Sequence, residues 1–99
     1  MHRITHAQAH KDFTVELRFD DGRQARVSLS DLIESASVAQ PFRDSERFVR
    51  ELKIAEQGDV LRWNPQFELH ADSLRYRAFP EELERDYGPQ RGRGGRPAA

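Results

Sequence analysis

The fold is decided by one stretch, residues 13–29, which reads FTVELRFDDGRQARVSL. Its apolar side chains alternate with polar ones twice, first over residues 13–19 and again over residues 25–29. Such alternation is typical of a strand with one buried face and one wet face. The polar run between them, Asp20 to Arg23, is a hairpin signal. The stretch therefore predicts two antiparallel strands joined by a tight turn.

Parity selects the turn of this hairpin. A two-residue loop, Asp21-Gly22, would place apolar side chains opposite polar ones. A three-residue loop from Asp20 to Gly22 keeps the apolar side chains on one face, because a slip of one residue reverses the face of a whole strand. Gly22 then takes the left-handed position of a G1 bulge, which glycine adopts without strain. This register forms three apolar pairs, Leu17 with Ala25, Val15 with Val27, and Phe13 with Leu29.

The rest of the first half predicts one more strand and two helices. Residues 3–10 form a third strand, although their apolar residues are small. Ser30 caps a helical turn over residues 31–34, and residues 35–41 form a loop. Asp44 caps a helix that continues to about Glu51. This helix is expected to bury three apolar side chains, Phe48, Val49 and Leu52.

The second half predicts shorter elements. Residues 53–56 and 60–63 form a second hairpin, and residues 67–69 form a further strand. Asp72 or Ser73 caps a helix, and Pro80 begins another turn that Gly88 ends. The apolar residues of these two helices are Leu74, Tyr76, Phe79, Leu83 and Tyr87. The prediction is an α+β fold, a small two-layer domain with an antiparallel sheet of about five strands and two or three short helices on one face.

Length and composition indicate one small domain. The 99 residues include six Phe and one Trp, which suffice for a thin core. We expect this domain to cover residues 1–87 and an Arg/Gly-rich tail, residues 88–99, to be disordered because it lacks large apolar side chains. No apolar run approaches the roughly 20 residues of a membrane span, so no membrane partner is expected. The absence of cysteine excludes disulfides and fits a cytoplasmic location.

Charge is distributed unevenly along the chain. Sixteen Lys and Arg residues oppose seventeen Asp and Glu residues. Three of the arginines lie in residues 88–99, so residues 1–87 hold thirteen basic against seventeen acidic residues, a net charge of about -4. Neutralising phosphates requires clustered Lys and Arg. The acidic body therefore disfavours a nucleic-acid partner and favours a basic protein.

Three blocks of the sequence occur in an order shared with a known family. They are FDDGR with LSDLI (residues 19–23 and 29–33), PFRDSERF (residues 41–48), and LRWN with LHADSL (residues 61–64 and 69–74). Together they resemble the small bacterial domain of unknown function 2442 family over about residues 4–76. The resemblance implies a compact α/β domain with no assigned enzymatic activity, found alone or fused to a helix-turn-helix. It also implies a small protein partner, as in toxin–antitoxin-like pairs.

Four histidines are candidates for metal or acid–base chemistry. His2, His6 and His10 recur every four residues, which on a helix could bring His6 and His10 to one ion. On the predicted strand, residues four apart are roughly 13 Å apart, too far for a shared ion. His70 lies near Glu68 and Asp72 and could join them in an acid–base group, or it could be a surface loop histidine.

No set of residues predicts catalysis. Asp20, Asp21 and Asp31 are explained by turn and cap chemistry. The chain also lacks a Gly-rich phosphate loop and a Ser–His–acid order. We therefore expect no enzymatic activity, no catalytic residue, no cofactor and no metal.

The candidate partner-binding residues lie on the wet face of the central hairpin. They are Glu16, Arg18 and Arg26, with Ser28 beside them. Trp63 is a further candidate, either as an exposed contact or as a core residue. The resulting hypothesis is a protein-interaction module, the antitoxin-like member of a pair, with a homodimer through sheet edges as another arrangement.

The tail supports an alternative hypothesis. Arg91, Arg93 and Arg96 are interleaved with glycine, as in arginine–glycine segments that bind nucleic acid. No aromatic residue lies among them for base stacking. The alternative is a nucleic-acid-associated regulator that binds through this tail.

Overall fold

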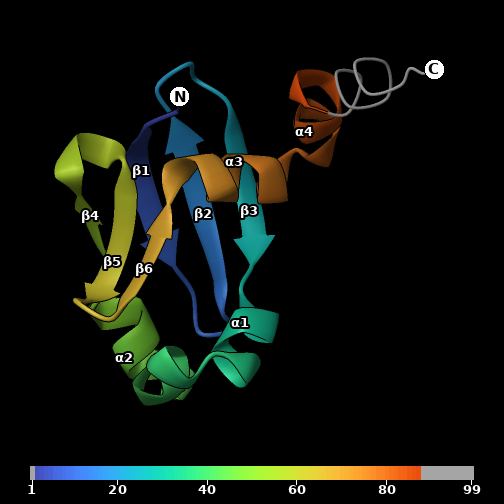
Figure 1. The fold of residues 1–99 in the computed structure, drawn as a ribbon. Coiled ribbons are helices and arrows are strands. Elements are labelled where there is room, and N and C mark those ends of the chain that lie inside the picture. The colour runs from blue at the N-terminus through green and yellow to red at the C-terminus, as the bar shows by residue number, and fades with distance from the viewer. Residues whose placement is uncertain (1, 88–99) are drawn as a thin grey trace.

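Six strands form two separate antiparallel sheets in the computed structural model, which describes residues 2–87 (Figure 1). The first sheet has the order β1 (Ile4–Ala9), β2 (Thr14–Phe19), β3 (Gln24–Ser28). The second has the order β4 (Lys53–Ala55), β5 (Val60–Asn64), β6 (Phe67–His70). The α+β class is confirmed, but the expected single sheet of about five strands is wrong.

Three short helical segments connect the two sheets along the chain. The connection from β3 to β4 contains α1 (Ser30–Ser35), the 3-10 helix η1 (Ser37–Arg43) and α2 (Ser45–Arg50), gathered at one end of the sheets (Figure 1). A six-residue helix is only about 9 Å long. Residues of both sheets and of the helices between them enter one hydrophobic core cluster.

The central hairpin has the predicted register. Val15 is opposite Val27, and Leu17 is opposite Ala25. The turn is the three-residue loop, because the Phe19 N–H donates to the Arg23 carbonyl at 2.9 Å and the Gly22 N–H donates to the Phe19 carbonyl at 2.9 Å. Gly22 has a φ of 91°, the left-handed position of the bulge.

The turn between β1 and β2 repeats this geometry with a phenylalanine. The Phe13 N–H donates to the His10 carbonyl at 3.0 Å, and the His10 N–H donates to the Thr14 carbonyl at 2.9 Å. Phe13 has a φ of 65°, so it lies in the turn and not in the strand where the pattern placed it. Its ring packs edge-on against Phe48 at 5.3 Å, and this core contact accompanies the strained backbone.

The helical middle confirms one predicted cap and corrects three other details. The Asp44 carboxylate accepts the N–H groups of Glu46 at 3.0 Å and Arg47 at 3.4 Å and begins α2, as predicted. Ser30 is instead the first residue of α1, without a side-chain cap. Residues 37–43, expected mostly as loop, form η1, which buries Ala39 and Phe42. Val49 is 37% exposed, because α2 buries only Phe48 among its residues.

The last two helices are α3 (Ala71–Ala78) and α4 (Pro80–Asp86). Pro80 occupies the first turn of α4, as predicted. His70, and neither Asp72 nor Ser73, precedes α3, which makes no side-chain cap bond. Gly88 and the predicted disordered tail lie outside the described residues. No helix within residues 2–87 is long and apolar enough to cross a membrane.

Gly58 lies where the two sheets approach each other. It ends the short 3-10 helix η2 (Glu56–Gly58) between β4 and β5, with a φ of 99°. A Cβ atom at this position would lie 2.7 Å from the backbone oxygen of Ile4 on β1. The absent side chain therefore allows the second sheet to contact the first.

Aromatic rings fill the core between the sheets. The Trp63 ring stacks on Phe48 at 5.3 Å and on Phe67 at 4.8 Å. Its indole N–H donates to the Phe48 carbonyl at 2.9 Å. Trp63 is only 4% exposed. Its side chain is therefore a core residue, and not the exposed partner contact that was one of its two interpretations.

Candidate functional site

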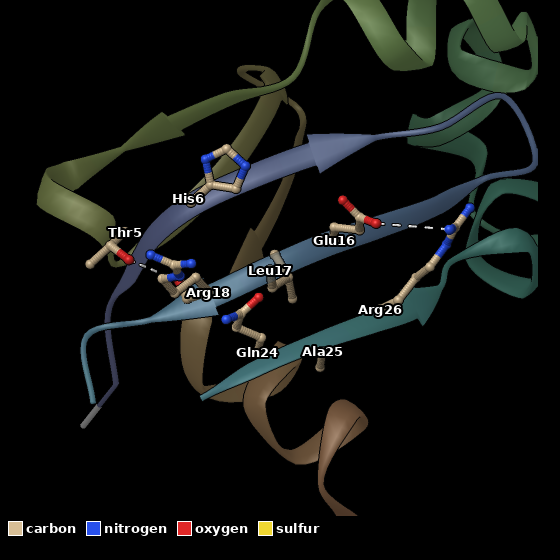
Figure 2. Close-up of a pocket in the computed structure, with 8 residues that line it drawn as sticks. All are labelled: Thr5, His6, Glu16, Leu17, Arg18, Gln24, Ala25 and Arg26. Carbon is tan, nitrogen blue, oxygen red and sulfur yellow. Dashed lines mark hydrogen bonds and ion pairs between the residues drawn. The ribbon is translucent and has the colours of Figure 1, made fainter. Parts of the chain in front are cut away.

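The wet side of the first sheet is the surface on which the structure gathers the predicted partner-binding residues. We call it the outer face. Glu16 and Arg18 come from β2 and Arg26 from β3, where alternation directs them away from the core (Figure 2). The face forms an open depression with a volume of about 820 Å³. The residues that line it are Thr5, His6, Glu16, Leu17, Arg18, Gln24, Ala25 and Arg26.

Strand register arranges the polar side chains of this face in two rows across the sheet. His6 is opposite Arg18, and Arg18 is opposite Gln24. The next row has Gln8 opposite Glu16 and Glu16 opposite Arg26. Side chains directly opposite each other in antiparallel strands have Cβ atoms about 4.5–5.5 Å apart. We call the first row the donor row and the second the paired row.

The paired row is internally compensated. The Arg26 Nε donates to the Thr14 Oγ1 at 2.9 Å, and its guanidinium lies 3.8 Å from Glu16 and 3.5 Å from Asp12. The imidazole of His10 lies 3.6 Å from the other Glu16 oxygen. Hydrogen bonds from the Thr14 hydroxyl and amide, with the nearby Arg26 charge, lower the pKa of Asp12. This end of the outer face therefore has partners for its charges.

The donor row is different. Within residues 2–87, the Arg18 guanidinium makes neither an ion pair nor a hydrogen bond, and only its backbone carbonyl accepts from the Thr5 hydroxyl, at 3.2 Å. His6, Arg18 and Gln24 are all exposed. The row thus presents unpaired N–H donors to solvent beside a row whose charges are satisfied (Figure 2).

One edge of this sheet is partly closed. The Arg77 side chain of α3 donates from Nε to the Ser28 carbonyl at 3.1 Å, and its guanidinium pairs with Asp31. This contact lowers the pKa of Asp31. Ser28, the fourth residue of the predicted contact face, therefore has its carbonyl engaged by the protein itself.

A second polar group was not predicted. Arg75 of α3 is 3% exposed and Glu82 of α4 is 2% exposed. The Arg75 guanidinium donates to Glu82 at 2.7 and 3.0 Å and to Asp21 at 2.7 and 3.0 Å. Arg23 adds a contact of 2.6 Å to Glu82 and lies 3.7 Å above the Phe79 ring. We call these residues the Arg75 cluster.

The charged groups of the Arg75 cluster are paired with one another. Hydrogen bonds with Arg75 lower the pKa of both Asp21 and Glu82, and the two carboxylates raise the pKa of Arg75. The cluster joins the tip of the β2–β3 turn to α3 and α4. The sequence explained Asp21 by turn chemistry, and its Oδ1 does accept the Arg23 N–H at 3.1 Å. Its second role, the contact with Arg75, was not predicted.

The histidines do not assemble a metal site. His6 lies on the outer face, His10 lies in the first turn, and the backbone N–H of His2 donates to the Asp72 carboxylate at 2.7 Å. Among residues 2–87, no group of three side chains could hold a metal ion.

His70 lies in a smaller hollow. It lines a cavity of about 300 Å³ together with His2, Glu56, Asp59, Val60 and Asp72. Glu68 is not part of this lining, since Arg62 holds it at 2.6 Å. The possible acid–base group of Glu68, His70 and Asp72 is therefore not formed, and His70 is instead an exposed residue at the end of β6.

Comparison with known proteins finds a matching family model and a solved structure with a similar fold. The family model described as "Protein of unknown function (DUF2442)" matches residues 4–80, which confirms the resemblance. No curated protein matches the chain. Among solved structures, it is similar to a protein from Nitrosomonas europaea that bears the provisional name DNA-binding protein, with a TM-score of 0.75 and 18% identity. The match covers 95% of this chain and 61% of that one.

The structure does not test the predicted role of the tail. Arg91, Arg93 and Arg96, the predicted nucleic-acid contacts, are outside the described residues. The structure thus places Glu16, Arg18 and Arg26 on one surface and Trp63 in the core.

Proposed function

The chain belongs to the DUF2442 family of proteins of unknown function, and we propose that it is a non-enzymatic protein-interaction module whose contact surface is the outer face. In finer terms, we propose the antitoxin-like member of a two-protein pair. The net charge of about -4 over residues 1–87 supports a partner that is basic overall, because opposite fields steer encounter.

The observation that carries this proposal is a charged strand face whose polar side chains lie outside the hydrophobic core. Glu16, Arg18 and Arg26 point away from the core, so their substitution leaves the apolar side of the sheet intact. Arginine is enriched at protein interfaces, where its planar fork combines packing with directed hydrogen bonds. The depression, with a volume of about 820 Å³, has room for a protruding segment of a partner.

The test compares capture by surface variants of the tagged full-length protein. The face variant carries Glu16→Gln, Arg18→Gln and Arg26→Gln. The control is Lys53→Gln on β4, because Lys53 is an exposed strand residue of the other sheet. A small protein that is captured stoichiometrically, survives nuclease treatment and is lost only with the face variant supports the proposal. Equal capture by both variants would sink the assignment of this face.

A second function is supported by the name of the structural neighbour and by the tail arginines. That neighbour is provisionally named a DNA-binding protein, although part of its chain has no counterpart in the match. A nucleic-acid-associated regulator would bind through Arg91, Arg93 and Arg96. Removal of residues 88–99 should then abolish salt-sensitive retention of nucleic acid. Undiminished retention by the shortened protein would exclude the tail.

A further inference from the structure

We propose that the donor row, Arg18 flanked by His6 and Gln24, is a binding site for a single carboxylate side chain of the protein partner. The inference rests on the proposed function and deepens it. It names which part of the outer face recognises which group on the partner.

The register of the sheet builds the site. His6, Arg18 and Gln24 come from three neighbouring strands and lie directly opposite one another. Cross-strand neighbours of this kind are close enough to contact one ligand together. Arg18 lies in the middle, on the central strand, where the backbone is held from both sides. A carboxylate above Arg18 therefore meets a guanidinium fork with an imidazole and a side-chain amide beside it.

Comparison of the two arginines on this face shows why Arg18 is the binding residue. Arg26 already donates to Thr14 and lies near Glu16 and Asp12. Arg18 has no such partner within residues 2–87. A free guanidinium presents two parallel N–H groups that match the two oxygens of a carboxylate. The charges of the paired row are thus engaged with one another, whereas the Arg18 N–H groups of the donor row are available to a ligand.

Net charge favours a carboxylate over a nucleic-acid phosphate. Binding to a polyphosphate gains its free energy from many neutralised phosphates, which requires several unpaired cations. The donor row holds one arginine, and residues 1–87 carry a net charge of about -4. That field repels a polyanion but allows one buried acid on a partner that is basic elsewhere. The proposed partner therefore has a positive net charge, and the single side chain that contacts Arg18 is negative.

The test titrates the full-length protein with N-acetyl-glutamate amide, which has one carboxylate, and with N-acetyl-glutamine amide as its neutral match. NMR of the arginine side-chain N–H groups reads Arg18 and Arg26 separately. We expect a saturable shift at Arg18 with the carboxylate probe only. Arg18→Gln should weaken binding about tenfold, since a charge-assisted bidentate contact is lost. Arg26→Gln, on the same face, should weaken binding less than Arg18→Gln because Arg26 is already paired. The control is Arg50→Gln, an exposed arginine of α2 outside the outer face, which should change binding by roughly twofold or less.

Three outcomes would overturn the inference. Equal shifts from the two probes would show that charge is not recognised. Equal loss in Arg18→Gln and Arg26→Gln would make the effect a property of the whole face. A stronger saturable shift of the donor row with single-stranded DNA would assign the row to nucleic acid.

The capture experiment separates this inference from the proposed function. If the face variant loses the partner but the carboxylate probe does not bind, the outer face remains the interface and the donor row is not the carboxylate site. If the probe binds at Arg18 but the face variant keeps its partner, the proposed function fails at this surface.

Discussion

Arg75 shows how much of this small fold depends on one buried charge. Its guanidinium lies between carboxylates of α4 and of the β2–β3 turn, and it lies 4.9 Å from the Phe19 ring and 5.1 Å from the Phe79 ring. Removing a guanidinium from water costs several kcal/mol, which only well-placed partners offset. Loss of one partner should therefore cost more than an exposed ion pair contributes.

The first prediction concerns Glu82. Glu82→Gln keeps the shape of the side chain but leaves the buried Arg75 with one carboxylate in place of two. We expect the free energy of unfolding to fall by about 2–3 kcal/mol, less than for a fully orphaned charge because Asp21 remains. Urea denaturation measures it. Glu81→Gln, on the exposed side of α4, is the control and should change stability by less than about 0.5 kcal/mol.

The second prediction concerns acid stability. The pKa values of Asp21 and Glu82 are both lowered in the folded protein, so both carboxylates bind protons more readily when it unfolds. Their stabilisation is present above the ordinary carboxyl pKa of about 4 and is lost as the pH falls below it. Melting temperature measured from pH 7 to pH 3 should fall steeply in the wild type and less steeply in Glu82→Gln. Parallel curves would contradict this origin.

Sequence position explains why the Asp44 cap was predictable and the Arg75 cluster was not. A cap acts within three residues, so its partners are written beside it. Arg75 and Asp21 are 54 positions apart, and the break at Pro80 hides the relation of Arg75 to Glu82. Glu16, Arg18 and Arg26 were placed correctly because strand parity alone directs them outward.

At the scale of elements, both turns of the first sheet use the same chemistry. Asp12 accepts the Thr14 N–H at 3.1 Å, as Asp21 accepts the Arg23 N–H at 3.1 Å, and each turn ends on a left-handed residue. In the second turn that residue is Gly22, and glycine predicts such a turn. In the first turn it is Phe13, whose aromatic side chain favours a strand. Its positive φ accompanies the contact of its ring with Phe48 in the core.

The third prediction compares two glycines with positive φ. Gly22→Ala should cost roughly 1–2 kcal/mol of unfolding free energy, the backbone penalty alone, because no atom lies within 4 Å of the new Cβ. Gly58→Ala should cost at least about 1 kcal/mol more, since its Cβ would lie 2.7 Å from the Ile4 oxygen. Chemical denaturation of both variants isolates this contact between the sheets. Equal losses of unfolding free energy would show that the backbone near Ile4 moves to accommodate the new Cβ.

At the scale of the whole molecule, alternation along a strand tells which face is buried but not what covers it. The apolar side of β2 was visible in the sequence, whereas residues 60–63 were predicted only as a strand of a second hairpin. The shared core of the two sheets was not predicted, because it joins residues far apart in the chain. The same limit hid η1, whose Pro41 and small residues are typical of a loop.

The fourth prediction follows from the shared core. Trp63 stacks between Phe48 and Phe67 and reports the second sheet, whereas Leu17, 2% exposed, lies in the first. Leu17→Ala should lower stability by about 2–5 kcal/mol. It should move the Trp63 fluorescence transition and the circular-dichroism transition in urea together, as two-state unfolding requires. A Trp63 midpoint that stays in place would mean that the two sheets unfold separately.

The alternation within β2 also separates two kinds of evolutionary constraint. Val15, Leu17 and Phe19 face the core, whereas Glu16 and Arg18 face solvent on the same strand. Sequence can therefore drift on the outer face without repacking the interior. On the proposed function, related modules in one cell become specific for different partners through a few such exchanges, each with a compensating change on the partner. Recognition then diversifies while the apolar core of the domain is unchanged.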